Sequence, residues 1–306
     1  MSRHKQTGFI LSLLGLLCLV TAAPVSARQP IATLTSATLI GENYYHYVEA
    51  QETLIELARH AGVGYGALIL ANPDIDPWQP SVGAEVLVPR AAIVPDQARP
   101  GITINLAERR LYLIREGNSE APIRAYPIGI GREGSDTPTG QYQVINLIAG
   151  PNWTPPANTR TERPELPAVV PPGPENPLGD YWIGLSADNI GLHGTNRPYG
   201  IGRQVSSGCI RLYPEHIHVL FHRAHIGMPV TIIDQPIKLG QKDGHLYLEA
   251  HPDPDSRVAA PLTEVMRQRD LVAPDVQLDW HKVRQVLAAR TGVPHPVSAP
   301  AVPAGH

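Results

Sequence analysis

Residues 99–234 carry an alternation of apolar and polar positions that is typical of β-strands. In the segment ITINLAERRLYLIRE, apolar side chains occupy every second position over 102–106, the polar pair Glu108-Arg109 follows, and the alternation resumes at Leu111. A period of two on either side of a short polar break predicts a β-hairpin. The runs IRAYPIGIG, GQYQVINLI, YWIGL and MPVTIID continue the pattern, and Pro214 suits the first turn of a helix that extends to residue 223. We expect a mainly β domain with one helix.

Residues 44–90 show a different order of elements. A short β-type run over 45–49 is followed by Thr53, which can cap a helix whose apolar residues share one face. A second short helix ends at the breaking segment NPDIDPW, and AEVLVP supplies a closing strand. The result is a small β-α-α-β unit, near the lower size at which a hydrophobic core is stable alone.

The first 27 residues are predicted to be an export signal. Arg3 and Lys5 form a basic start, residues 9–20 form an apolar segment, and PVSA ends in a small-residue cleavage site after Ala27. The alternative is a retained membrane anchor, but this apolar segment is shorter than the ~20 residues that a spanning helix needs. We therefore expect cleavage, a linker over 28–43, and no stable membrane span in the mature protein.

Charge and cysteine content narrow the class of protein further. The chain has 25 basic and 28 acidic residues. Binding to phosphate backbones needs clustered Lys and Arg, so a nucleic-acid partner is not expected. Removing the signal also removes Cys18 and leaves Cys209 as the only cysteine. An unpaired cysteine in an exported protein is an intermolecular partner or a reactive thiol. The flanking SSG turn is a poor place to bury an inert cysteine, which favours the reactive thiol.

A proline-rich segment interrupts the β pattern. Nine prolines lie between residues 151 and 179. Proline has no N–H for a sheet ladder, so this segment is predicted to be a long irregular loop. Loops of this length either cover a site or are idle insertions, and we favour a lid.

Residues 235–306 are a C-terminal extension without an evident role. GHLYLEAHP predicts a strand and residues 279–289 an amphipathic helix, while the composition of the final segment VPHPVSAPAVPAGH predicts a disordered Pro/Ala-rich tail. His245, His251 and His281 do not have the spacing of metal ligands, so we expect them on the surface and no metal site.

Cys209 and His193 stand in a context that suits nucleophilic catalysis. A cysteine nucleophile needs a base, an electropositive setting for the thiolate and backbone donors for an oxyanion. His193 is the candidate base, and Gly208 lets the N–H groups of the turn approach an acyl oxygen without obstruction. Arg211 lies on the same face as Cys209 if CIRL is extended, and its guanidinium could hold a carboxylate.

These motifs resemble the catalytic domain of the L,D-transpeptidases, the YkuD family and its ErfK/YbiS-like branch. The matching pieces are HGT (193–195) and SSGCIRL (206–212), and the turn TPTGQY (137–142) is also similar. Many members have a second histidine directly before the glycine, where this chain has Ser207. The resemblance implies a YkuD-like β-sandwich or barrel over 99–234 with a helix after the cysteine motif.

The resemblance implies a cysteine acyltransferase that needs no cofactor. Cys209 would attack the carbonyl of the third residue of a peptidoglycan tetrapeptide stem, releasing D-alanine and leaving a thioester. An amine would resolve the thioester: the third residue of another stem in a 3-3 cross-link, a lysine of an outer-membrane lipoprotein, or a free amino acid. The expected catalytic residues are Cys209, His193, Gly194, whose carbonyl would orient the imidazole, and Gly208. The expected substrate-binding residues are Arg211, Ser207, Ser206 and Thr195.

The unit at 44–90 resembles a LysM module. The matching residues are Tyr47, Val48, Glu52, Thr53, Leu54, Leu57, Ala58, Asn72, Pro73, Gly83, Val86, Val88 and Pro89, with QETL in place of the usual GDTL. The resemblance implies binding to the glycan strand of peptidoglycan, which would place the protein in the periplasm. A small packing domain without glycan affinity is the alternative.

Two other functions share this motif set. A thiol L,D-carboxypeptidase would use water in place of the acceptor amine, because the thioester is common to both reactions. A non-catalytic wall-binding protein would keep the fold without thiol chemistry.

Overall fold

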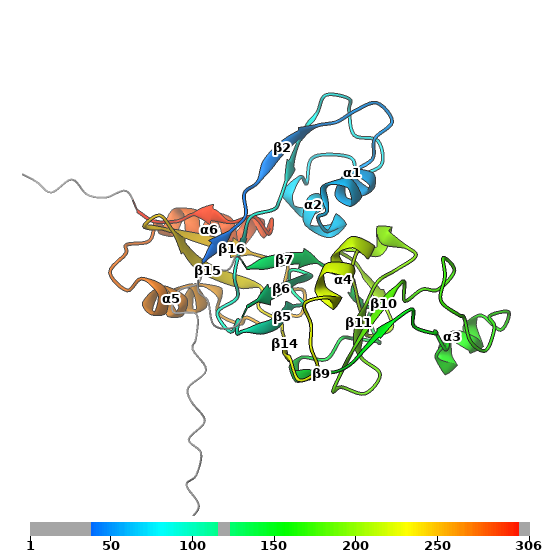
Figure 1. Ribbon diagram of the computed structural model, residues 1–306. Helices are drawn as coiled ribbons and strands as arrows, with labels where there is room; N and C mark the ends of the chain where they lie inside the picture. Colours follow the sequence, from blue (N-terminus) through cyan, green and yellow to red (C-terminus); the bar gives the residue numbers. More distant parts are fainter. Residues whose placement is uncertain (1–37, 116–122, 300–306) are drawn as a thin grey trace, which may run out of the picture. The chain divides into compact units, whose positions relative to one another are not determined.

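The computed structural model describes residues 38–115 and 123–299 (Figure 1). An eight-stranded mixed sheet forms the centre of the predicted β domain, in the order β13-β11-β10-β9-β14-β5-β6-β7. Its strands are β5 (Gly101–Asn105), β6 (Arg110–Ile114), β7 (Arg124–Pro127), β9 (Gly140–Ala149), β10 (Tyr181–Leu185), β11 (Gly191–His193), β13 (Ile210–Arg211) and β14 (Pro229–Ile233). The mainly β prediction is confirmed.

The hairpin prediction is also confirmed. β5 and β6 pair antiparallel from Gly101↔Ile114 to Asn105↔Arg110, so the polar break at 108–109 is the turn. β14 pairs parallel with β5, and β11 pairs parallel with β13. Antiparallel pairing joins the remaining neighbours of the sheet. The parallel pair β11-β13 lies at one end of the sheet, and its two strands carry parts of the HGT and SSGCIRL motifs.

The predicted helix after the cysteine motif is α4 (Pro214–Phe221), with Pro214 in its first turn. Its buried residues Ile217 and Leu220 join the sheet core, in which Ile104, Leu111 and Ile183 are fully buried. Figure 1 shows α4 beside β10 and β11. Shorter elements complete this region: β8 (Ile130–Gly131), which pairs parallel with β12 (Gln204–Ser206), α3 (Ala157–Glu162) and the 3-10 turn η1 (Pro198–Gly200).

The order β-α-α-β predicted for 44–90 is the one observed. The elements are β2 (Tyr44–Tyr47), α1 (Leu54–Ala61), α2 (Tyr65–Ala71) and β3 (Glu85–Val88), and β2 pairs antiparallel with β3. Thr53 caps α1 as expected, and Glu56 completes a capping box with it. The core of this unit includes Leu54, Leu68 and Val86. Beside it, β1 (Leu39–Ile40) pairs with β4 (Ala92–Ile93).

Residues 235–299 fold around a hydrophobic core of their own. β15 (Ile237–Lys242), β16 (His245–Ala250) and β17 (His295–Pro296) form a sheet, and α5 (Pro261–Val272) and α6 (Trp280–Ala289) contribute to its core. The expected disorder is wrong for 293–299, because β17 pairs with β16 and Val297 is buried in this core. Residues 300–306 and the predicted signal at 1–27 lie outside the described residues.

Within residues 38–115 and 123–299, no single helix is long and apolar enough to cross a membrane. Helices α1 and α2 meet such a criterion only together, and they are bent by 116° at their junction.

Candidate active site

Strands β11 and β13 bring the two sequence motifs together. Their parallel register pairs Leu192 with Ile210 and His193 with Arg211, so Cys209 lies one position before the paired segment, beside Gly191. Leu192 and Ile210 are fully buried in the sheet core. Since side chains alternate along a strand, His193 and Arg211 project from the opposite face, and Cys209 belongs to that face as well. Residues sixteen positions apart in the sequence thus share one surface of the sheet.

The His193 imidazole is buried and held in one tautomer. Its Nδ1 lies 2.6 Å from the Gly194 carbonyl oxygen. A carbonyl can only accept, so Nδ1 carries the proton and Nε2 of the neutral ring keeps a lone pair. The hydrogen bond expected from the family resemblance is therefore present. The indole of Trp182, which is paired with His193 across β10 and β11, stacks on the ring with centroids 5.9 Å apart.

The environment keeps His193 neutral. Burial, and then the charge of Arg211, lower its pKa to about 3, against the opposing effect of the Gly194 and Leu178 carbonyls. At neutral pH the ring is an unprotonated base. This state allows it to accept a proton at Nε2.

The Cys209 thiol is also neutral at rest. Burial raises its pKa, although a backbone hydrogen bond from Gly191 and the charge of Arg211 act in the other direction. The thiol donates to the Asn189 carbonyl at 3.3 Å and forms no disulfide. The expected thiolate is thus not preformed, and proton removal has to accompany the attack on an acyl group.

The turn before Cys209 is fixed by two hydroxyl groups. Thr137 Oγ1 donates to the Gly208 carbonyl at 2.8 Å and accepts from the Gly131 N–H at 3.0 Å. Ser206 Oγ donates to the Cys209 carbonyl at 2.5 Å. Gly208 has φ +101°, a conformation that favours glycine. The segment TPTG therefore supports the cysteine turn from a neighbouring loop.

The predicted substrate-binding residues do not all face outward. Ser206 is 2% exposed and Thr195 5% exposed, and Thr195 Oγ1 accepts from the Arg197 N–H. Their hydroxyl groups bond to the backbone of the two motif loops, and their contact with substrate stays a prediction. Ser207 is exposed, and Arg211 is half-buried.

Arg211 has spare hydrogen-bonding capacity. Its Nε is buried and has no hydrogen-bond partner within the described part of the chain. Burial lowers its pKa, Cys209 raises it, and Arg197 lowers it, which shows that a second guanidinium is close. An incompletely partnered guanidinium beside the thiol fits an anionic group that arrives from outside.

Two residues that contact the site are not singled out by the sequence. Trp182 is predicted only as part of a strand, and Thr137 only as part of a turn similar to one in the family. Pairing of Trp182 with His193 depends on sheet register, and the sequence alone did not supply it.

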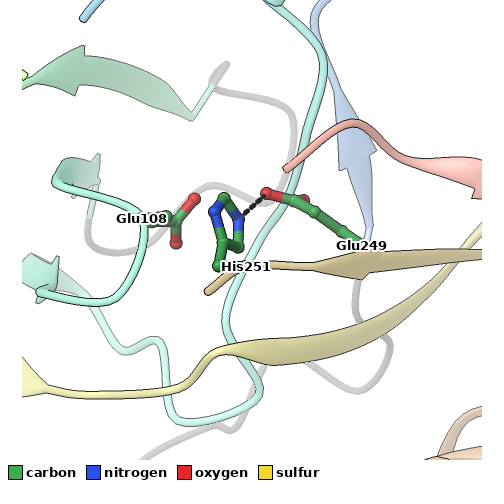
Figure 2. Close-up of side chains that lie close together, drawn as sticks. All are labelled: Glu108, Glu249 and His251. Atoms are coloured by element: carbon green, nitrogen blue, oxygen red, sulfur yellow. Dashed lines mark hydrogen bonds and ion pairs between the residues drawn. The ribbon is translucent and has the colours of Figure 1, made fainter. Parts of the chain in front are cut away.

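A separate cluster satisfies the distance criterion for a metal site. Ligand atoms of Glu108, Glu249 and His251 lie within 4.8 Å of one another, and Figure 2 shows the His251 ring between the two carboxylates. Lys238 Nζ, however, lies 2.7 Å from Glu108 Oε2 and 3.1 Å from Glu249 Oε1. Arg110 Nη1 also contacts Glu108, at 3.2 Å.

These contacts make the cluster an ion-pair network. The two carboxylates already face two cations, so the donor set does not fit a metal ion as well as it fits the ammonium of Lys238. His251 was expected on the surface, and this expectation is wrong: the side chain is 5% exposed and its Nε2 lies 2.7 Å from Glu249 Oε1.

Comparison with known proteins gives consistent matches. Residues 99–232 match the family model YkuD, described as the L,D-transpeptidase catalytic domain. The probable L,D-transpeptidase YcfS of Escherichia coli is 38% identical over 291 residues, which cover 89% of each chain. The probable L,D-transpeptidase ErfK/SrfK of Salmonella typhimurium is 38% identical over 81% of this chain and 83% of its own. The Escherichia coli protein of the same name is 34% identical over 85% and 88%.

Proposed function

The chain belongs to the YkuD family of L,D-transpeptidases, and from this premise we propose that Cys209 is its nucleophile and His193 its general base. The protein is an L,D-transpeptidase that acts on the stem peptides of peptidoglycan. The observation that carries the assignment of residues is the parallel pairing of β11 with β13, which gives Cys209 and His193 a common face. The lone pair on His193 Nε2 supports it.

The first half-reaction forms a thioester. The thiol sulfur of Cys209 bonds to the carbonyl carbon of the third stem residue while its proton passes to Nε2 of His193. The C–N bond to the terminal D-alanine then breaks, and the imidazolium returns the proton to the departing amine. Concerted proton transfer suits this site, because both groups are neutral at rest.

The second half-reaction regenerates the thiol. An acceptor amine attacks the thioester, loses a proton to His193, and forms an amide bond as the sulfur departs and recovers a proton. We propose the side-chain amine of another stem's third residue as the main acceptor, giving a 3-3 cross-link, with a lipoprotein lysine or a free amino acid as further acceptors. If water attacks the thioester in place of the amine, the product is a tripeptide, as for a carboxypeptidase.

The turn that ends at Cys209 is proposed to stabilise the negative charge that develops on the acyl oxygen. The backbone N–H groups of Gly208 and Cys209 form the proposed oxyanion hole. The φ of +101° at Gly208 and the Thr137 bond to its carbonyl support this role, because they fix the direction of the peptide planes. Preorganised donors of this kind cost no rearrangement during the reaction.

Arg211 is the proposed partner of a substrate carboxylate. The unpartnered Nε and the nearby Arg197 support a site for an anionic part of the stem peptide. We assign Ser207 to substrate contact on its exposure, and Ser206 and Thr195 to the shape of the two motif loops.

The unit at 44–90 is proposed to be a LysM-like module that binds the glycan strand. Four of its aromatic rings are exposed, Tyr44, Tyr45, Tyr47 and Trp78, and rings of this kind stack on sugars. Holding the glycan would raise the local concentration of stem peptides at Cys209. Together with the export signal proposed for residues 1–27, this glycan binding supports the periplasm as the proposed location of the enzyme.

Purified protein incubated with tetrapeptide muropeptides tests the assignment. Mass analysis separates cross-linked dimers from the tripeptides that hydrolysis would give. We expect dimers from the wild type and no product from Cys209→Ala or His193→Ala. Wild-type turnover in either variant would remove that residue from its role, and tripeptides alone would make the enzyme a carboxypeptidase.

A further inference from the structure

The proline-rich loop over 151–179 is organised by one buried side chain, Asn176. Its Nδ2 lies 2.8 Å from the Pro151 carbonyl, 3.2 Å from that of Pro171 and 3.3 Å from that of Val170. Its Oδ1 accepts from the Leu178 N–H at 2.9 Å. The side chain is fully buried, at 0% exposure. A single amide thus ties the beginning, middle and end of the loop.

The composition of the loop explains why an asparagine is needed there. Prolines supply carbonyl groups without supplying N–H groups, so a compact proline-rich loop has more acceptors than donors. Buried carbonyls need a partner, and the two amide hydrogens of Asn176 provide it. The loop therefore has a defined internal structure, and its role as a lid stays a prediction.

The end of this loop packs against the backbone that follows His193. Gly179 has φ +66°, and a β-carbon placed on it would be 2.9 Å from the Thr195 nitrogen and 3.1 Å from the Gly194 α-carbon. A β-carbon placed on Gly194 would be 3.2 Å from the Leu178 carbonyl oxygen. The two chain segments touch through their backbones, with no side chain between them.

This contact can affect the imidazole through the Gly194 peptide, to which the ring is hydrogen-bonded. His193 donates from Nδ1 to the Gly194 carbonyl, so a displacement of the Gly194 peptide moves the ring. The Leu178 carbonyl acts on the ring as well, opposing the effect of burial on the pKa. The uncharged Trp182 from β10 also stacks on the ring, the cationic Arg211 from β13 lowers its pKa, and Cys209 shares its face of the sheet.

We propose that Asn176 is a positioning residue for His193: it folds the end of the 151–179 loop into a turn that holds the Leu178 carbonyl and the Gly194 peptide in place around the imidazole. The inference rests on the proposed role of His193 as the base. It gives the loop a specific function, which is to orient the base.

The first test compares Asn176→Ala with Asn72→Ala. Asn72 is a matched control, because it is a buried asparagine that bonds the carbonyls of Leu68 and Leu87 and the Leu87 N–H, in the unit at 44–90. Both variants are expected to lower the midpoint of thermal unfolding. Only Asn176→Ala is expected to lower kcat, by roughly tenfold to a hundredfold with a soluble tetrapeptide, since small misplacements of a catalytic group have effects of this size.

The second readout is the titration of His193 itself, followed by NMR of histidine-labelled protein and assigned with His193→Ala. In the wild type the ring should remain neutral at pH 4.5, as a pKa of about 3 requires. Loosening the loop admits water, which relieves the burial that lowers the pKa, and it also withdraws the Leu178 carbonyl, which raises the pKa. Burial is the largest of these effects, so in Asn176→Ala the ring should titrate nearer its ordinary value of 6.5. Asn72→Ala should titrate like the wild type.

Gly179→Ala offers an independent route if Asn176→Ala does not fold. The added methyl would push the loop away from Thr195, and the same fall in kcat and rise in pKa are expected. Gly83→Ala is its control, with φ +79° and nothing within 4 Å of an added β-carbon. Two folded variants with unchanged kcat and an unchanged His193 titration would overturn the proposal. Turnover retained in His193→Ala would instead refute the role of the base.

Discussion

At the scale of single residues, the reactivity of Cys209 depends on a thiol that is protonated at rest. Because burial raises the pKa of this thiol above its ordinary value of 9.0, the thiolate fraction at pH 7 is small. We expect alkylation of the free enzyme by iodoacetamide to be slow at neutral pH and to accelerate as the pH rises, since the thiolate is the nucleophile.

The alternative is a thiolate–imidazolium pair, which would give a rate that is already constant above about pH 4, as for cysteines with strongly lowered pKa values. Alkylation rates measured from pH 5 to 10 by intact mass distinguish the two cases. His193→Ala should leave the alkaline rise in place, since the neutral imidazole does not ionise the resting thiol.

Trp182 is predicted to orient the base. Its ring stacks on His193, and a β-carbon on Gly191 would lie 2.5 Å from the indole, so the ring covers β11 from Gly191 to His193. Trp182→Ala should lower kcat about tenfold, or ~1.4 kcal/mol in activation free energy, while Trp182→Phe keeps most of the activity. Steady-state kinetics with a soluble tetrapeptide measure this, and equal rates for all three proteins would contradict it.

Residue types and spacing predict Cys209, His193 and Arg211 as site residues, because a thiol, an imidazole and a guanidinium stand beside glycines in two short motifs. The residues that set the protonation and orientation of these side chains could not be predicted in this way. Trp182 reaches His193 through the register of β10 with β11, and Leu178 reaches it through the folding of a loop. The first contact depends on strand register and the second on how a long loop folds, and a local pattern of residue types specifies neither.

At the scale of elements, β17 shows where composition misleads. Its segment contains prolines and small residues, which suggested disorder, yet proline is tolerated on an edge strand. Pro296 pairs with Tyr247 at the edge of the sheet, and Val297 is fully buried against the α5 and α6 core. β17 has only two residues, so its sequence contains too little apolar–polar alternation to indicate a strand against a composition that is typical of disorder.

Val297 is therefore predicted to stabilise the C-terminal unit. Val297→Ala should lower the free energy of unfolding by roughly 2 kcal/mol, because it removes buried methyl groups and leaves a cavity. Val82→Ala is the control, since Val82 is 70% exposed and should have almost no effect. Urea unfolding followed by tryptophan fluorescence measures both. A disordered tail would instead give two variants with wild-type stability.

At the scale of the whole molecule, residues 235–299 are joined to the β5-β6 hairpin by the buried ion-pair network. Glu108 and Arg110 come from the hairpin, and Lys238, Glu249 and His251 come from β15 and β16 or the residue after it. Burial alone would raise the pKa of Glu249, but Lys238, His251 and Arg110 together hold it below its usual range. The predicted boundary at residue 234 thus marks a change in sequence pattern. It does not separate two independent parts, because the ion-pair network joins residues on both sides of it.

Removing the central cation of this network should destabilise both sides together. Lys238→Met leaves Glu108 and Glu249 with one cation fewer in a fully buried place, which is expected to cost about 3–5 kcal/mol. Adding Glu249→Gln to that variant restores the charge balance and should recover part of the loss, because the interaction between neighbouring charges is not additive. Equilibrium urea unfolding of the wild type, both single variants and the double variant gives the coupling energy.

The same network makes a prediction about pH. Since the folded-state pKa of Glu249 lies below its ordinary 4.5, the carboxylate contributes stability above that pH, and the contribution is lost as the pH falls through the folded value. The free energy of unfolding should therefore fall more steeply below pH 4.5 in the wild type than in the Lys238→Met, Glu249→Gln double variant. Equal slopes would mean that Glu249 is not held as an anion, and that packing between β15-β16 and the hairpin joins the two regions without the charges.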